Sequence, residues 1–125
     1  MRKKLFSTID PLGNTITLFE DTLNKHISVR HPNMKFQHEA IRLAIEQPII
    51  IGHSKKSKDT LLFLGTFSNK EQPFLIVAVK KVKNYDRIIL TAFSTKNIGI
   101  QKIETILWQN KKKLSTTHTL LSLKN

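Results

Sequence analysis

The 125-residue chain carries 21 lysines and arginines against 9 aspartates and glutamates, which gives a formal net charge of +12. Such an excess favours a polyanionic partner, with nucleic acid as the first candidate, although scattered lysines also describe an ordinary solvated surface. The absence of cysteine excludes disulfides, thiolate metal sites and a cysteine nucleophile. We expect one domain over residues 1–125, with a core from 10 to 110 and a basic, Ser/Thr/Leu-rich tail from 111 to 125.

The sequence contains no apolar run of the length needed to cross a bilayer. Its basic start, Met1–Lys4, is similar to the first part of a signal peptide, but Asp10 interrupts the apolar residues too early for a secretory segment. A chain without cysteine is also compatible with a reducing compartment. We therefore expect a cytoplasmic protein that does not contact a membrane.

The first elements are a turn, a short strand and a helix. Proline and glycine within Asp10–Asn14 predict the turn, and alternation over Thr15–Phe19 predicts the strand. We expect the helix to begin near Glu20 and to end near Arg30, because Pro32 disfavours helical geometry in the residue before it.

A second helix is expected between Asn33 and Pro48. Its less polar face consists of Gln37, Ala40, Ile41, Ala44 and Ile45. Its charged face consists of Glu39, Arg42 and Glu46. This division is typical of a helix that packs on a core.

Beyond Pro48 the sequence becomes rich in β-branched and aromatic residues separated by short polar segments. The strand candidates are Ile49–Ile51, Thr60–Phe67, Pro73–Val82, Arg87–Ser94 and Thr105–Trp108. Short connections between them favour antiparallel neighbours. Phe74–Val79 is apolar at every position, which predicts a central strand with both faces covered. Helices followed by strands predict an α+β fold.

The candidate chemistry begins in Lys25–Pro32, which packs two imidazoles and a guanidinium into a few residues before the proline. The apolar stripe of the predicted helix consists of Phe19, Leu23 and Ile27. At 100° per residue, His26 and Arg30 share one flank of this stripe, and His31 lies on the other. Histidines there can transfer protons near neutral pH, but they can equally be structural residues.

A second candidate is Thr91, a hydroxyl in an otherwise apolar strand. Alternation within Arg87–Ser94 places Thr91 on one face together with Ile89 and Phe93.

Other motifs for catalysis or metal binding are missing from the sequence. It has no phosphate-binding glycine loop, no helical zinc motif and no calcium-binding loop. None of the five histidines stands at a recognised metal spacing. These histidines are His26, His31, His38, His53 and His118. We therefore expect no metal and no cofactor, which leaves metal-independent cleavage of RNA, in which the substrate supplies its own 2′-hydroxyl nucleophile.

Four short motifs occur in a characteristic order along the chain. They are Asp10-Pro11-Leu12-Gly13, His26-Ile27-x-x-Arg30-His31-Pro32, Glu46-Gln47-Pro48-Ile49-Ile50 and Thr91-Ala92-Phe93. Together they resemble the phage-associated barnase, EndoU, colicin and RelE-like endoribonucleases, over Asp10–Trp108. The resemblance implies an α+β fold with N-terminal helices packed on a four-stranded antiparallel β-sheet, and an RNA groove across the exposed sheet face.

The resemblance also assigns individual residues. His26 matches the first histidine of the motif, His31 its His-Pro pair, and Thr91 its Thr-Ala pair. Phe93 stands where relatives often have tyrosine, so any role of that phenol is in doubt here. The hydroxyls left to position a phosphate are those of Thr91, Ser94 and Thr95.

The resulting hypothesis is general acid-base transphosphorylation that leaves a 2′,3′-cyclic phosphate. His26 is the first choice for proton transfer, Arg30 and either Lys80 or Lys96 stabilise the phosphorane charge, and Thr91 binds a non-bridging oxygen. The residues expected to contact RNA are Lys80, Lys81, Ser94, Thr95, Lys96 and His53. Each of them can instead be an ordinary surface or strand residue.

Two other classes of function stay open. A non-catalytic RNA-binding module would explain the charge, although few aromatics are expected on the surface to stack on bases. A protein-interaction domain is the other alternative. Because small nucleases of the resembling type include toxins, the resemblance also implies an antitoxin or immunity protein as partner, and delivery to a target-cell cytoplasm as a further location.

Overall fold

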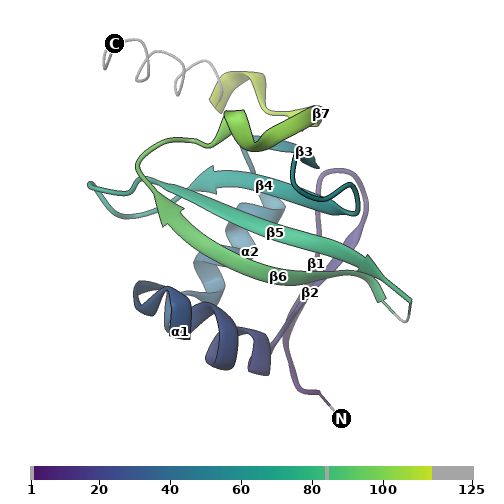
Figure 1. Ribbon diagram of the computed structural model, residues 1–125, viewed down its shortest axis with the longest axis vertical. Helices are drawn as coiled ribbons and strands as arrows, with labels where there is room; N and C mark the ends of the chain where they lie inside the picture. Colours follow the sequence, from purple (N-terminus) through teal and green to yellow (C-terminus); the bar gives the residue numbers. More distant parts are fainter. Residues whose placement is uncertain (1, 84, 114–125) are drawn as a thin grey trace.

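The computed structural model describes residues 2–83 and 85–113, which form a mixed β-sheet with helical segments packed against it (Figure 1). The strands are β1 (Lys4–Ile9), β2 (Thr15–Phe19), β3 (Ile50–Ser54), β4 (Thr60–Thr66), β5 (Phe74–Val82), β6 (Tyr85–Thr95) and β7 (Ile103–Gln109). The helical segments are η1 (Thr22–Ile27), α1 (Ser28–Arg30), η2 (Pro32–Met34), α2 (His38–Glu46) and η3 (Ile100–Lys102). Most of the predicted tail, residues 114–125 with His118, lies outside the described residues.

The sheet has seven strands in the order β1-β2-β6-β5-β4-β3-β7. Its neighbours are antiparallel except for β2 and β6, which run parallel. The prediction of N-terminal helices on a four-stranded antiparallel sheet is therefore wrong. Two strands precede the first helix, and β3 and β7 extend the far edge. Among the described residues, no helix is long and apolar enough to cross a membrane.

The predicted turn and strand at Asp10–Phe19 are confirmed, and they belong to a hairpin. β1 pairs with β2 across the turn, where the buried Asp10 carboxylate accepts hydrogen bonds from the backbone N–H groups of Leu12 and Asn14. Gly13 has a φ of +88°, a conformation that suits glycine. Strand β1 is the half of this hairpin that the sequence pattern did not reveal, because it is half exposed.

The first predicted helix is helical up to Arg30, but it is a π-helix through Ile27 and an α-helix only afterwards. Both the backbone N–H and the hydroxyl of Ser28 donate to the Leu23 carbonyl, which shows the wider turn. Leu23 and Ile27 are buried as expected, whereas Phe19 is buried in strand β2. The spacing of 100° per residue therefore does not apply to His26.

The second predicted helix is confirmed but shorter, because the turns before His38 delay its start. α2 buries Ile41, Ala44 and Ile45 against one face of the sheet (Figure 1). Close packing here depends on Gly65 in β4: a Cβ at this residue would lie 2.9 Å from the Ala44 Cβ.

The opposite face of the sheet carries a second apolar cluster. Its strand residues are Ile49, Ile50, Leu62, Leu64, Phe74, Ile76 and Ala78. Ile98, in the connection between β6 and β7, and Ile103, the first residue of β7, cover part of this face. The apolar run Phe74–Val79 of β5 is thus central, with both faces covered, as the sequence predicted.

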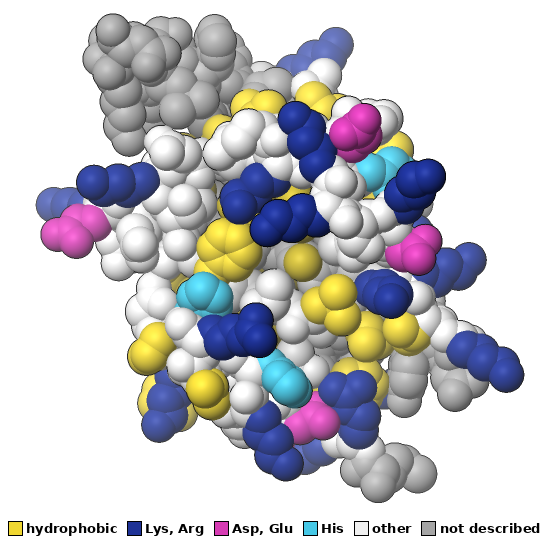
Figure 2. Space-filling model, in the orientation of Figure 1, with side chains coloured by type: hydrophobic (Ala, Val, Ile, Leu, Met, Phe, Trp, Pro, Cys, Tyr) yellow, Lys and Arg dark blue, Asp and Glu magenta, His cyan; other side chains and the backbone are white. Residues whose placement is uncertain are grey.

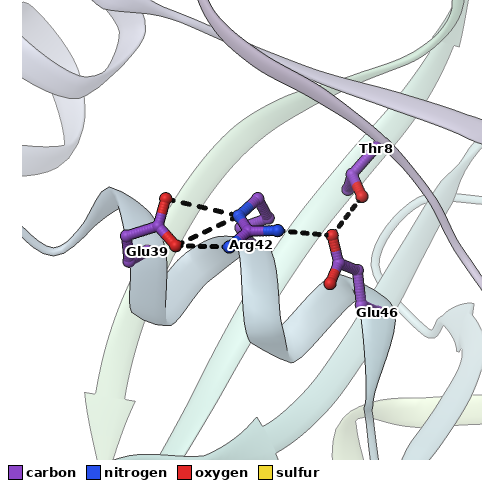
Figure 3. A network of polar contacts seen from close by, with 4 residues as sticks. All are labelled: Thr8, Glu39, Arg42 and Glu46. Atoms are coloured by element: carbon purple, nitrogen blue, oxygen red, sulfur yellow. Dashed lines mark hydrogen bonds and ion pairs between the residues drawn. The ribbon is translucent and has the colours of Figure 1, made fainter.

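Helix α2 is tied to the edge hairpin by the polar network in Figure 3. The Arg42 guanidinium donates to the carboxylates of Glu39 and Glu46, and the Thr8 hydroxyl of β1 donates to Glu46. The hydrogen bond from Arg42 holds the pKa of Glu39 below its ordinary value. The same bond raises the pKa of Arg42.

We predict that Gly65→Ala destabilises the fold by about 1–3 kcal/mol, because the new methyl group must displace the Ala44 backbone. Urea unfolding measures this free energy. The neighbouring exposed residue offers a control, Thr66→Ala, which should change stability by no more than about 0.5 kcal/mol. Equal stability of Gly65→Ala and the wild type would contradict the close packing of α2 on β4.

We predict that Arg42→Gln lowers the melting temperature at neutral pH and that this difference shrinks in acid. The folded-state pKa of Glu39 is lowered, so the stability that Arg42 provides is present above the unfolded pKa of glutamate and is lost as pH falls through the folded value. Thermal unfolding across that range measures it. The control is Lys70→Gln, since Lys70 forms no ion pair within the described residues. A melting-temperature difference that does not change with pH would contradict the stabilising role of the Arg42–Glu39 pair.

Candidate functional site

A groove of about 510 Å³ lies on the sheet face opposite α2. Its floor consists of Leu62, Ile76, Ala78, Thr91 and Phe93. Its rim consists of Ser54–Ser57 at the end of β3 and of Gln101 and Lys102 in η3, and Thr60 at the start of β4 also lines it. The groove therefore begins where the apolar cover of the second face ends.

A β-bulge in β6 decides which side chains reach this floor. Ala78 of β5 pairs with Thr91, but the next residue, Val79, pairs with Ile89, so Leu90 is an additional residue. Ile89 consequently faces the helix-covered core, whereas Thr91 and Phe93 face the groove. The prediction that these three residues share one face is wrong, because simple alternation does not include the bulge.

The rim of the groove is strongly basic. Lys55, Lys56 and Lys102 line it, no aspartate or glutamate does, and none of the three lysines forms an ion pair within the described part of the chain. The Lys102 Nζ lies 5.7 Å from the centroid of the Phe93 ring. In Figure 2, which views this face, dark blue and cyan side chains gather around yellow hydrophobic ones. Such a surface suits an anion with apolar parts.

Two backbone features hold the basic rim in place. The Lys55 N–H donates to the Lys102 carbonyl at 2.9 Å, which joins the loop after β3 to η3. Gly99, with a φ of +87°, packs against Ile76: a Cβ there would lie 2.7 Å from the Ile76 Cδ1. A larger residue at this position would have to displace the end of the Ile76 side chain and would adopt a backbone conformation that suits glycine.

The margin of the groove carries a histidine. The His31 ring stacks on Phe93, with centroids 5.4 Å apart and planes inclined by 29°. His31 is half-buried between α1 and η2, and its backbone N–H donates to the Ile27 carbonyl. The next turn is fixed to β6, because the Asn33 amide donates to the Ser94 hydroxyl at 2.8 Å. A proton-transfer group thus contacts the groove from an anchored segment.

The structure separates the two predicted histidines by their surroundings. His26 is exposed on η1, and its side chain makes no hydrogen bond, ion pair or ring contact within the described residues. Arg30 is exposed at the end of α1, directly before His31. Of the predicted catalytic residues, therefore, Thr91 lines the groove and His31 contacts the groove residue Phe93.

The predicted RNA-binding lysines do not form one cluster. Lys80 follows Ala78 on the same face of β5, and Lys81 points to the opposite face. Lys96 lies in a separate hollow with Lys70 and Glu71. Thr95, the residue before Lys96, pairs with Phe74 at the start of β5. Phe74 and Lys80 are about 20 Å apart along β5, at about 3.3 Å per residue. Lys80 and Lys96 cannot contact the same phosphate.

The remaining predicted contacts are also divided between the two faces. Thr95 pairs with Phe74 and so belongs to the groove face, but beyond the groove. Ser94 accepts from Asn33 and donates to the Gln72 side chain, so its hydroxyl is already bonded. His53 pairs with Leu61 of the helix-covered core, which places it opposite the groove.

The residues that sequence reasoning missed are the lysines of the rim. Lys55 and Lys56 were visible as part of a basic loop, but nothing in the pattern connected that loop to Thr91. The sequence around Lys102 did not indicate a binding residue, because the position of Lys102 depends on how the connection between β6 and β7 crosses the sheet.

No protein-family model, curated protein or solved structure matches the chain. Among the residues that the structure describes, no group of three or more histidine, aspartate or glutamate side chains could hold a metal ion. The function of the groove is therefore inferred from its geometry alone.

We predict that the double variant Lys55→Glu/Lys102→Glu binds single-stranded polyanions much more weakly than the wild type. For each phosphate that is no longer neutralised, the slope of log affinity against log salt should fall by about 0.7. Fluorescence anisotropy with labelled RNA over a salt series measures both effects. The matched control is Lys70→Glu/Lys96→Glu in the separate hollow, which should have a smaller effect. A larger effect of the control would move the binding site there.

Proposed function

We propose that the protein is a metal-independent endoribonuclease that cleaves RNA in the basic groove. The observation that carries the proposal is the His31 imidazole stacked on Phe93, at the margin of a groove that offers cations and hydroxyls but no carboxylate. An imidazole that can give or take a proton beside a phosphate-binding surface is what transphosphorylation requires.

The groove can bind RNA in two ways at once. Lys55, Lys56 and Lys102 are exposed cations that can pair with backbone phosphates. The apolar floor and the Phe93 ring can receive the face of a base or ribose, because aromatic side chains stack on bases in single-stranded RNA. An RNA strand is therefore a better ligand for this surface than a compact inorganic anion.

The chemistry uses the substrate as nucleophile. The 2′-hydroxyl oxygen forms a bond to the adjacent phosphorus, the bond from phosphorus to the 5′-oxygen breaks, and a 2′,3′-cyclic phosphate results. One proton leaves the 2′-hydroxyl, and one is delivered to the departing 5′-oxygen. His31 performs one of these transfers, which is worth about 10²- to 10⁴-fold in rate.

Charge develops on the phosphorane oxygens during this step. Lys102 lies beside the Phe93 ring that contacts His31, and the Thr91 hydroxyl is on the same floor. These two groups can stabilise the developing charge, and Arg30, next to His31, adds a second cation. Phe93 itself brings no hydroxyl, so its part is to position the imidazole and a base.

We assign proton transfer first to His31, although the sequence favoured His26. The ring of His31 touches a groove residue, whereas the side chain of His26 makes no such contact. His26 remains available for the second proton transfer, because the two histidines belong to one continuous helical segment and its C-terminal turn.

An RNA-cleaving protein acts where RNA is found, so we place its activity in a cytoplasm, either its own or that of a target cell. A basic groove without carboxylates would accept an acidic inhibitor protein. An antitoxin or immunity protein that covers this groove therefore belongs to the proposal.

We predict that the purified protein cleaves single-stranded RNA in EDTA and that His31→Ala lowers the rate by at least about 10²-fold. RNA binding and melting temperature should change little in this variant. The rate should depend on pH, because proton transfer requires the imidazole in the correct protonation state. The 5′ fragment should end in a cyclic phosphate, and an oligonucleotide with a 2′-deoxyribose at the cleavage site should be resistant.

His26→Ala is the matched comparison. A larger drop in rate than that of His31→Ala would return the main role to His26, and full activity of both variants would contradict the mechanism. Binding without any cleavage would identify a non-catalytic RNA-binding module. Cleavage that stops in EDTA would indicate a metal mechanism instead.

A further inference from the structure

Phe36 combines two unfavourable features. Its side chain is 81% exposed, more than any other large hydrophobic side chain in the described part of the chain. Its φ is +67°, and among the described residues no other non-glycine residue has a positive φ. Phe36 therefore gains little from the core and occupies a backbone conformation that residues with a Cβ rarely adopt.

The strain has a defined geometry. The Gln37 N–H donates to the Met34 carbonyl at 3.0 Å, and Lys35 has φ −59° and ψ +131°. These angles describe a type II β-turn with Phe36 at its third position, where glycine is normally required. Burial in the described fold does not compensate for a phenylalanine there, which suggests that the ring contacts a molecule outside this chain.

The turn is rigidly connected to the groove margin. The Met34 N–H donates to the carbonyl of His31, and Met34 itself is fully buried. Asn33 is bonded to Ser94 of β6, and His31 stacks on Phe93. Phe36 is thus held on an anchored segment, five residues after the histidine that contacts the groove.

We propose that Phe36 is a stacking platform for a nucleobase of single-stranded RNA that extends out of the groove. The Lys35 Nζ lies 5.2 Å from the centroid of the Phe36 ring, where it can bind the phosphate next to a stacked base. This inference rests on the proposed function, and it adds a second contact with the same substrate: an unpaired base beyond the groove, since a base inside a duplex would first have to leave its stack to reach the ring.

A base fits this ring better than the apolar surface of a protein partner. Phe36 is flanked in sequence by exposed Lys35 and half-buried Gln37, so polar groups adjoin it on both sides along the chain. A protein interface over the ring would also bury the adjacent ammonium group, whereas an RNA strand brings a phosphate for it.

The test is the binding of a short single-stranded 2′-O-methyl oligonucleotide, which lacks the nucleophilic hydroxyl and so cannot be cleaved. Phe36→Gly should weaken binding roughly 5- to 100-fold, while Phe36→Trp should retain it, because stacking needs only an aromatic face. Phe36→Gly should also melt at the same or a higher temperature, since glycine relieves the positive φ. Ile9→Ala removes another exposed apolar side chain, 60% exposed in β1, and should bind normally.

Two further ligands test whether Phe36 contacts a base or the RNA backbone. An oligonucleotide with the same backbone but abasic positions should bind weakly to the wild type and be insensitive to Phe36→Gly. A duplex of the same length should likewise be insensitive. If Phe36→Gly weakens binding of the abasic strand as much as that of the normal strand, the stacking proposal is overturned.

The outcomes distinguish this inference from the proposed function. Unchanged affinity of Phe36→Gly, with weakened binding by Lys55→Glu/Lys102→Glu, overturns the stacking platform and leaves the groove assignment intact. Binding that depends on Phe36 in a protein that does not cleave RNA supports the platform, although the nuclease proposal fails. No affinity of the wild type for single-stranded RNA at low salt overturns both.

Discussion

The fold depends on a central strand that is apolar on both of its faces. Leu75, Val77 and Val79 of β5 face α2, and Phe74, Ile76 and Ala78 face the other side, so each face of the sheet needs a cover. The helix provides the first cover. The connection between β6 and β7, together with the start of β7, covers the second face only in part. Ile98 and Ile103 leave the apolar side chains that line the groove uncovered. The candidate groove is the uncovered remainder.

Hydroxyl, lysine and imidazole groups lie close to this groove because of three local features of the backbone. The bulge at Leu90 turns Thr91 and Phe93 toward the groove, Gly99 lets the basic η3 segment approach the sheet, and the irregular turn after α1 brings His31 onto Phe93. Each is a departure from regular secondary structure, and such departures are common at functional sites. The groove and the strained Phe36 turn are joined by one short, anchored segment.

The sequence predicted individual elements better than their assembly. The central position of Phe74–Val79 follows from an apolar run that only burial on both faces can satisfy, and the buried face of α2 follows from its periodicity. The four-stranded antiparallel sheet, which the family resemblance implied, was wrong: strand patterns such as Thr105–Trp108 in β7 were visible, but β1 is half exposed and has only a weak pattern. The parallel pairing of β2 with β6 joins residues about seventy positions apart, which local pattern cannot indicate.

The same division applies to the candidate site. Composition determined that the protein is basic and has no cysteine chemistry, and residue types marked His26, His31 and Thr91 as groups worth locating. Only the tertiary structure decided that Thr91 lines a groove whose Phe93 contacts His31, that Lys55 and Lys102 form its rim, and that Lys80 and Lys96 lie too far apart to act together. The physical reason is that a bulge, a left-handed glycine and a long-range strand pairing determine where side chains point, and their effects extend beyond the residues that cause them.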